Sequence, residues 1–307
     1  MTMPRRVIPG ATHMLTRRCS RREYRLLQTK KKRQFLAYAL AVVSARHGVE
    51  VHAAVAMTNH YHMVATDVRG VMPAFNQDFN SLVARAVNAE QGRHEAMWSS
   101  QRMSQVELVD AEDIWRKLVY TLGNPAAADL VDRLSHWPGF AVRLVDHERP
   151  PQVILRPTMV LFSGKTTMPE TATLQLSVPR AFGDMTGKEF SCEARERLAV
   201  YEAELRAARK ADGRHVLGVR ELKRRHHTHR PASPDVRSGR DPAIASKNTP
   251  RRIAALHALR AFRDAYRAAF AKWRQHLAPV SFPYGTYKMR SDLGVLIDLP
   301  PPTALAS

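Results

Sequence analysis

Hydrophobic positions in the first 124 residues follow two spacings that alternate along the chain. A repeat of three or four residues predicts helices over the ranges 28–47, 71–91 and 111–123. Short runs of β-branched or apolar residues predict strands over 13–19, 49–57, 61–67 and 105–109. Gly48 is expected to end the first helix, and Asp110 and Asn124 are expected to mark the start and the end of the third.

These elements follow the order β-α-β-β-α-β-α. The order predicts an α+β fold, in which a ferredoxin-like antiparallel sheet carries its helices on one face. It argues against a doubly wound parallel sheet, because that fold needs regular alternation of strand and helix and a glycine-rich first turn.

The character of the chain changes near Pro150. We expect three parts: a first domain over 1–149, a variable extension over 150–248, and a C-terminal helix and tail over 249–307. Residues 210–248 are rich in Lys and Arg and poor in large apolar side chains, which predicts a mobile basic segment. The long helix predicted to start at Thr249 has an apolar stripe from Leu256 to Trp273, so it is expected to pack on another part of the protein.

The chain is strongly basic, because its 307 residues include 48 Lys and Arg against 28 Asp and Glu, a formal charge of +20. This excess predicts a polyanionic partner, since each phosphate that a protein neutralises releases condensed counterions. No apolar run approaches the roughly 18 residues of a membrane span, and no secretory signal is expected. The 2 cysteines are far apart and support neither a disulfide framework nor a cysteine zinc site. We therefore expect a cytoplasmic, nucleoid-associated protein with no membrane partner.

The segment from Met57 to His62, with the sequence Met-Thr-Asn-His-Tyr-His, carries the first candidate chemistry. Alternate side chains of a strand share a face, so His60 and His62 are expected to point the same way. Two imidazoles on one face, next to a hairpin turn, can hold one metal ion. A His-x-His pair is more often accidental, so the spacing alone leaves a purely structural role open.

The second candidate lies at the end of the third predicted helix. Tyr120 and Asn124 are one helical turn apart and are therefore neighbours on one face. The amide oxygen of Asn124 suits a hard divalent cation, and the Tyr120 phenol can act as a nucleophile. A tyrosine near a helix end is more often half-buried packing, so this motif is weak when taken alone.

Taken together, the two motifs resemble those of the IS200-like single-tyrosine (Y1) transposases of the HUH class, and most closely their REP-associated tyrosine transposase branch. The resemblance covers residues 5–140, most of the predicted first domain. Residues 58–62 match the family's Pro-Asn-His-x-His element, with Thr58 in place of proline, and residues 120–125 match its Tyr-x-x-x-Asn-Pro element. The basic run that follows Asn-Pro in the family is replaced here by the Ala-Ala-Ala-Asp of residues 126–129.

The resemblance implies a specific activity. His60, His62 and Asn124 would hold Mg²⁺ or Mn²⁺ at a phosphate of single-stranded or hairpin DNA. Tyr120 would attack that phosphate and form a 5′-phosphotyrosine bond, so that nicking and rejoining need no ATP. The expected protein is a DNA transposase that acts as a single-strand DNA endonuclease and strand transferase.

The candidate DNA contacts are five arginines: Arg5, Arg6, Arg17, Arg18 and Arg102. One alternative is a domesticated protein of the same fold that binds or regulates DNA without turnover, and the reduced positive charge after Asn124 favours it. A second is a metal-dependent hydrolase of another phosphodiester, which would not need Tyr120. The sequence leaves the target DNA, and the choice between monomer and homodimer, open.

Overall fold

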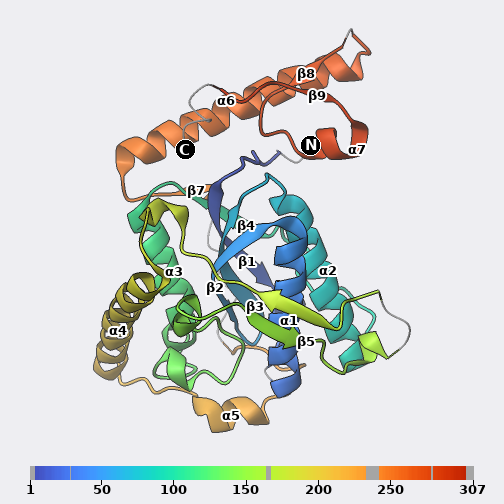
Figure 1. Ribbon diagram of the computed structural model, residues 1–307. Helices are drawn as coiled ribbons and strands as arrows, with labels where there is room; N and C mark the ends of the chain where they lie inside the picture. The colour runs from blue at the N-terminus through green and yellow to red at the C-terminus, as the bar shows by residue number, and fades with distance from the viewer. Residues whose placement is uncertain (1–3, 28, 164–166, 233–241, 278, 302–307) are drawn as a thin grey trace.

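The computed structural model describes residues 4–27, 29–163, 167–232, 242–277 and 279–301, and Figure 1 shows how its elements are arranged. The helices are α1 (Lys30–His47), α2 (Met72–Gln91), α3 (Ala111–Ala127), α4 (Gly187–Ala211), α5 (Gly218–Arg224), α6 (Thr249–Arg274) and α7 (Lys288–Leu293). The strands are β1 (Ala11–Arg18), β2 (Val49–Ala56), β3 (His60–Asp67), β4 (Ser104–Leu108), β5 (Gln152–Leu155), β6 (Thr171–Leu174), β7 (Ile244–Ala245), β8 (Ser281–Phe282) and β9 (Leu296–Ile297). From β1 to α3 the order is β-α-β-β-α-β-α, which confirms the prediction from the sequence.

A five-stranded sheet in the order β2-β3-β1-β4-β7 forms the centre of the molecule. The first four strands in this order are antiparallel neighbours, and His60 and His62 of β3 lie opposite Arg18 and Thr16 of β1. The fifth strand, β7, pairs in parallel with β4. The prediction of a purely antiparallel sheet is therefore wrong at this edge, because the added strand comes from the extension and is too short to leave a hydrophobic pattern.

Helices cover both faces of the sheet, as Figure 1 shows. α1 and α2 pack on one face, where Leu15 and Met63 belong to the buried core. α3 and α4 pack on the other face, against Met14 and Val64. The prediction that all helices lie on one face is wrong, because successive residues of β1 and β3 are apolar and both faces must be covered. The α+β class is confirmed, and the ferredoxin-like comparison stays a prediction.

Capping residues fix the ends of the helices around the sheet. Gly48 ends α1 in the left-handed conformation, at φ 65°, as predicted. The carboxylate of Asp67, at the end of β3, accepts hydrogen bonds from two backbone N–H groups at the start of α2, both at 2.8 Å. Asp110 caps α3, as predicted, and accepts a hydrogen bond from the Asp113 N–H at 3.0 Å.

α3 continues past the point where the sequence predicted its end. The helix runs to Ala127, with Pro125 inside it. The carbonyl oxygens of Asn124 and Pro125 accept hydrogen bonds from the N–H groups of Ala128 and Leu130, at 2.9 and 3.0 Å. The predicted end at Asn124 is therefore wrong, because the following residues satisfy these carbonyls and keep Asn124 on the helix.

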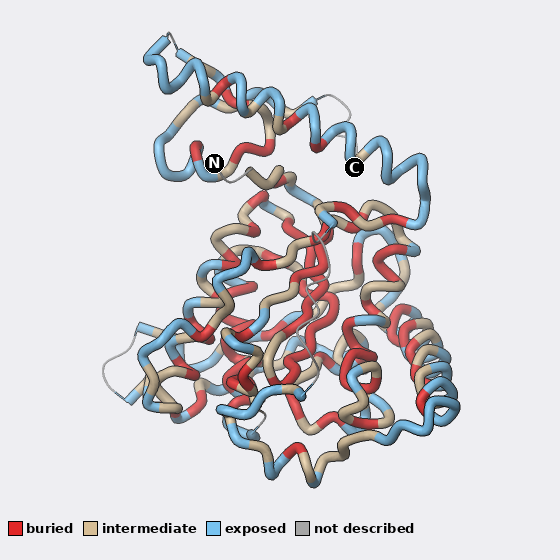
Figure 2. The backbone as a smooth tube through the Cα atoms, turned by 180° about the vertical axis from the view of Figure 1, so that it is seen from behind, coloured by how far each residue is buried: buried red, intermediate tan, exposed pale blue. Residues whose placement is uncertain are grey.

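The C-terminal helix packs as its apolar stripe predicts. Leu259 and Phe262 of α6 are buried with Ile244 of β7, and Ala269 is buried with Phe282. The two ends of the predicted stripe are exposed. Figure 2 shows that much of α4 and α6 faces solvent, whereas the strands of the sheet are buried.

The segment 210–248, predicted to be mobile, contains α5 and β7, and its residues 233–241 lie outside the described residues. The domain boundaries after residues 149 and 248 stay predictions. Among the helices that the structure describes, none has the length and the apolar character needed to cross a membrane.

Candidate active site

The turn between β2 and β3 sets the direction of the two histidines. The Met57 N–H donates to the carbonyl of His60 at 2.8 Å and closes a tight turn. The Cys19 N–H donates to the carbonyl of Asn59 at 2.7 Å and fastens this turn to the end of β1. β3 therefore starts at His60, and the alternation of the strand puts His60 and His62 on the same face.

The two imidazoles lie edge to face, with ring centroids 4.8 Å apart. The Nδ1–H of His60 donates to Oδ1 of Asn59 at 2.7 Å, and Nδ1 of His62 shares a hydrogen bond with the hydroxyl of Thr16 at 2.8 Å. Contacts of this kind fix the orientation of metal-binding imidazoles through one nitrogen and leave Nε2 for another partner.

α3 brings Tyr120 and Asn124 to the same place. The Tyr120 ring packs edge-on against His62, with centroids 5.5 Å apart, and the Tyr120 side chain is 37% exposed. The buried side chain of Asn124 makes a hydrogen bond with His60. The four residues predicted for the site therefore lie together on the α3 face of the sheet, and their chemical roles stay predictions.

Two positively charged side chains, those of Arg18 and Lys117, lie beside these residues. Arg18 lies opposite His60 across the strand pair, and Nζ of Lys117 lies 5.3 Å from the centroid of the Tyr120 ring. Burial and the charge of Arg18 lower the pKa of His60 to about 4. Burial, His60 and the two cations lower the pKa of His62 well below its usual value. Both rings are therefore neutral at pH 7, which is the form that ligates metals.

The side chains of the site fit a divalent cation whose coordination is completed by oxygen atoms of a substrate. His60, His62 and Asn124 offer two imidazole nitrogens and an amide oxygen, and Mg²⁺ or Mn²⁺ would need further oxygen ligands. Within the described ranges, no group of three or more His, Cys, Asp or Glu side chains is placed to hold a metal ion. Because Arg18 and Lys117 repel a free cation, a phosphate oxygen is the natural additional ligand.

α4 packs on the part of α3 that carries Tyr120. Gly123 gives room for this contact, since a Cβ at that position would lie 2.7 Å from the ring of Tyr201. Burial and the proximity of Tyr120 raise the pKa of Tyr201. Tyr201 is thus a second phenol close to the candidate nucleophile.

Arg209 of α4 binds the C-terminus of α3. Its buried guanidinium donates to the carbonyl of Ala126 at 2.7 Å and to the carboxylates of Asp129 and Asp132 at 2.8 and 3.1 Å. Arg214 pairs with the same carboxylate of Asp129. The run 126–129 lacks basic residues of its own, and the two arginines that reach it from later in the chain are balanced by Asp129, Asp132 and Asp212.

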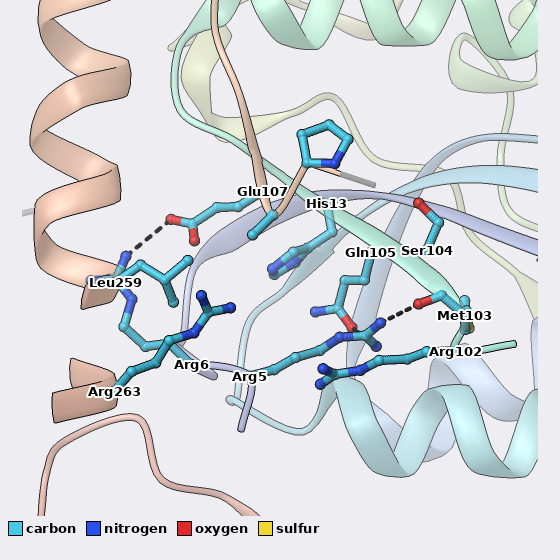
Figure 3. A pocket seen from close by; sticks show the side chains of 12 residues that line it. Arg5, Arg6, His13, Arg102, Met103, Ser104, Gln105, Glu107, Leu259 and Arg263 are labelled. Carbon is cyan, nitrogen blue, oxygen red and sulfur yellow. Dashed lines mark hydrogen bonds and ion pairs between the residues drawn. The ribbon is translucent and has the colours of Figure 1, made fainter. Parts of the chain in front are cut away.

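The five predicted DNA contacts do not form one cluster. Arg18 is exposed and lies next to His60. Arg17 points to the opposite face of the sheet and donates to the carbonyl of Gln101 at 2.7 Å. The remaining three line a separate cavity, shown in Figure 3: Arg5, Arg6 and Arg102.

The sequence motifs missed several side chains that support the site. Lys117 precedes Tyr120 by three positions, and this helical spacing was an available signal for a cation beside the phenol. Asn59 lies within the matched element 58–62 and Thr16 lies on the first predicted strand, but no spacing indicates that their amide and hydroxyl groups bind the two imidazoles. Tyr201 lies in a charged helix far along the chain, where no local pattern connects it to α3.

No protein-family model matches the chain, and no curated protein matches it. Several solved structures are partly similar. A REP-associated tyrosine transposase bound to a REP hairpin is 22% identical, over 48% of this chain and 87% of its own, with a TM-score of 0.41. A transposase candidate from Deinococcus radiodurans R1 is 16% identical, over 34% of this chain and 85% of its own, with a TM-score of 0.26. The tRNA(His) guanylyltransferase of Saccharomyces cerevisiae is 8% identical, over 42% of this chain and 64% of its own, with a TM-score of 0.32. Because these TM-scores are low, the function has to follow from the side chains of this protein.

Proposed function

We propose that this protein is a metal-dependent tyrosine transposase that nicks and rejoins single-stranded DNA beside a hairpin. The observation that carries the proposal is the contact of the Tyr120 ring with His62, at 5.5 Å between centroids, with His60 4.8 Å from His62. An exposed phenol can attack a phosphate, and imidazoles that bind a metal ion, together with two cations, can stabilise the charge that develops on it.

Each group has a role in this proposal. His60, His62 and Asn124 would hold Mg²⁺ or Mn²⁺, which when bound neutralises charge on the scissile phosphate. Arg18 and Lys117 flank the same point and stabilise the negative charge that develops on the phosphate oxygens during the displacement. Because Tyr120 is exposed, a single strand of DNA can reach the phenol without a change in the fold of the protein.

The reaction consists of two balanced displacements. In the first, the Tyr120 oxygen attacks phosphorus and the bond from phosphorus to the neighbouring 3′ oxygen breaks. The phenol loses its proton, the leaving 3′ oxygen gains one, and the 5′ end stays bound as a phosphotyrosine. In the second, a 3′-hydroxyl attacks the same phosphorus, and Tyr120 leaves and regains a proton. One phosphoester bond replaces another in each step, so no ATP is consumed.

Labelled hairpin DNA with a single-stranded flank, incubated with Mn²⁺, tests the proposal. The wild type should form an adduct that survives denaturing electrophoresis. Tyr120→Phe should form none, whereas the matched variant Tyr201→Phe should keep it. An adduct of undiminished yield in Tyr120→Phe would contradict the assignment of the nucleophile.

The same assay separates the two alternatives. A non-catalytic DNA-binding protein would bind the hairpin but would form no covalent adduct with any divalent ion. The reduced charge after Asn124 favours that alternative, and the structure leaves it open, because Arg209 and Arg214 at this end of α3 are paired with Asp129, Asp132 and Asp212. A hydrolase would release cleaved DNA through attack by water, and Tyr120→Phe would cleave as fast as the wild type.

A further inference from the structure

A cavity of about 370 Å³ opens where the N-terminal arm, β1, β4 and α6 meet (Figure 3). The titratable side chains of its wall are Arg5, Arg6, His13, Arg102, Glu107 and Arg263. His13 and Thr16 are an odd number of positions apart on β1, so the cavity lies on the opposite face of the sheet from the two site histidines. It is therefore separate from the candidate active site.

The wall of this cavity carries a large excess of positive charge. Four guanidinium groups face one carboxylate, that of Glu107, which Arg6 approaches to 3.4 Å. Arg102 and Arg263 line the same cavity, and burial, followed by the nearby charge of Arg263, lowers the pKa of Arg102. An anion in the cavity would be attracted by this excess of positive charge.

His13 is a second and independent sign of a ligand. His13 lines the cavity and is only 4% exposed, and its Nδ1 makes no hydrogen bond of normal geometry among the described residues, although the backbone of Ala11 lies close to the ring. The Nε atoms of Arg6 and Arg263 are also buried, and neither has a hydrogen-bond partner among the residues that the structure describes. A buried polar atom without a partner is unfavourable, so native proteins rarely keep such atoms unless a ligand or water satisfies them.

We propose that this cavity is a phosphate-binding site, for a phosphate group carried by a DNA strand or by a free phosphate compound. Guanidinium groups bind phosphate oxygens through paired N–H donors, and a volume of about 370 Å³ is within the usual range for small-ligand sites. His13 donates from Nδ1 to one phosphate oxygen when that nitrogen carries its proton.

The site gives the C-terminal helix a function in binding. Arg263 and Leu259 reach the cavity from α6, while the arm is held by a hydrogen bond of 2.9 Å from the Val7 N–H to the Gly285 carbonyl. Neither the sheet nor the C-terminal part alone builds this wall. His13 and Arg18 are five positions apart on β1, about 17 Å, so a DNA strand held in the cavity and at Tyr120 has to pass around the sheet.

Binding measurements on the full chain test the proposal independently of catalysis. All variants carry Tyr120→Phe and are measured without divalent ions, so that a failure of the nicking reaction does not affect the result. Hairpin DNA is titrated by fluorescence anisotropy, and inorganic phosphate and dAMP are titrated by calorimetry. Arg263→Gln is compared with Arg274→Gln, which removes the same charge from an exposed position on the same helix.

A DNA-bound phosphate predicts that Arg263→Gln weakens hairpin binding about tenfold and lowers the salt dependence by about one counterion, while Arg274→Gln has less than a twofold effect. A free phosphate compound predicts the same tenfold loss for inorganic phosphate or dAMP, with hairpin affinity unchanged. Arg102→Gln, on a different segment, should reproduce whichever loss is found. Equal affinities of Arg263→Gln and Arg274→Gln for all three probes would overturn the proposal.

Discussion

Arg209→Met tests whether α4 holds the end of the helix that carries the candidate nucleophile. The buried guanidinium of Arg209 bonds the Ala126 carbonyl and the carboxylates of Asp129 and Asp132. Methionine keeps the apolar stem of the side chain and removes the charge and all of these hydrogen bonds. The variant therefore isolates the contribution of the guanidinium from that of packing.

The expected magnitude follows from the exposure of the partners. Loss of one member of a fully buried ion pair costs about 3–5 kcal/mol, whereas exposed pairs contribute about 0.2–1 kcal/mol. The side chain of Arg209 is 5% exposed, but those of Asp129 and Asp132 are 28% and 47% exposed, so water reaches the carboxylates that remain. We expect Arg209→Met to lower the free energy of unfolding by about 2–3 kcal/mol, most of it from the charged donor lost at the helix end.

Urea unfolding followed by tryptophan fluorescence measures this difference, because Trp115 lies in α3. Arg214→Met is the matched control, since Arg214 binds the same Asp129 from a side chain that is 47% exposed. It should cost no more than about 1 kcal/mol. A loss below about 0.5 kcal/mol for Arg209→Met, or equal losses for both variants, would refute the proposed anchoring of α3 by α4.

The remaining predictions concern the site and the core. Lys117→Ala should slow nicking about 100-fold in single-turnover assays, whereas Lys117→Arg should retain most of the rate because it keeps the charge beside Tyr120. A rate for Lys117→Ala equal to that of the wild type would contradict this role of Lys117. The Mn²⁺ affinity measured by calorimetry should rise at least about tenfold when single-stranded DNA is bound, because Arg18 and Lys117 repel the free ion; equal affinities would contradict this. Burial lowers the pKa of His52 from 6.5 to about 4, so its contribution to stability is complete above pH 6.5 and is lost as the pH falls toward 4. In urea titrations between pH 7.5 and 4, wild type should therefore lose about 3 kcal/mol more than His52→Gln, and parallel pH profiles would exclude this contribution.

The helices and strands of the predicted first domain could be predicted because each follows a local rule. Apolar spacing predicted the helices and strands, and the capping residues Gly48 and Asp110 were predicted correctly. The meeting of His60 with His62 follows from the alternation of a strand, and the pairing of Tyr120 with Asn124 follows from one helical turn.

The covering of the second sheet face was missed because its residue pattern is mixed. Met14 and Val64 are apolar positions on this face, but the same strands also carry polar residues that are typical of a solvent-exposed surface, and these are buried and bonded to one another. Thr12 and Thr66 share a hydrogen bond of 2.7 Å, and His52 bonds Thr66 at 2.7 Å. Hydrogen bonding between buried side chains depends on the tertiary arrangement, so hydrophobic periodicity does not contain it.

The contribution of α4 and α6 to the two sites is equally non-local. Arg209 is 80 positions from Asp129, and no local spacing indicates that they pair. Arg263 meets Arg102 only because α6 folds back over the edge of the sheet. The sequence therefore identified the candidate catalytic residues, whereas the residues that position or surround them required the structure.

Mass spectrometry of the covalent adduct can show which tyrosine is the nucleophile. Trypsin separates the two neighbouring phenols, since Tyr120 falls in the peptide 118–133 and Tyr201 in the peptide 198–206. After reaction with hairpin DNA and nuclease trimming, we expect a nucleotide phosphate on Tyr120 in peptide 118–133. A modification on Tyr201, or cleaved DNA with neither peptide modified, would contradict it.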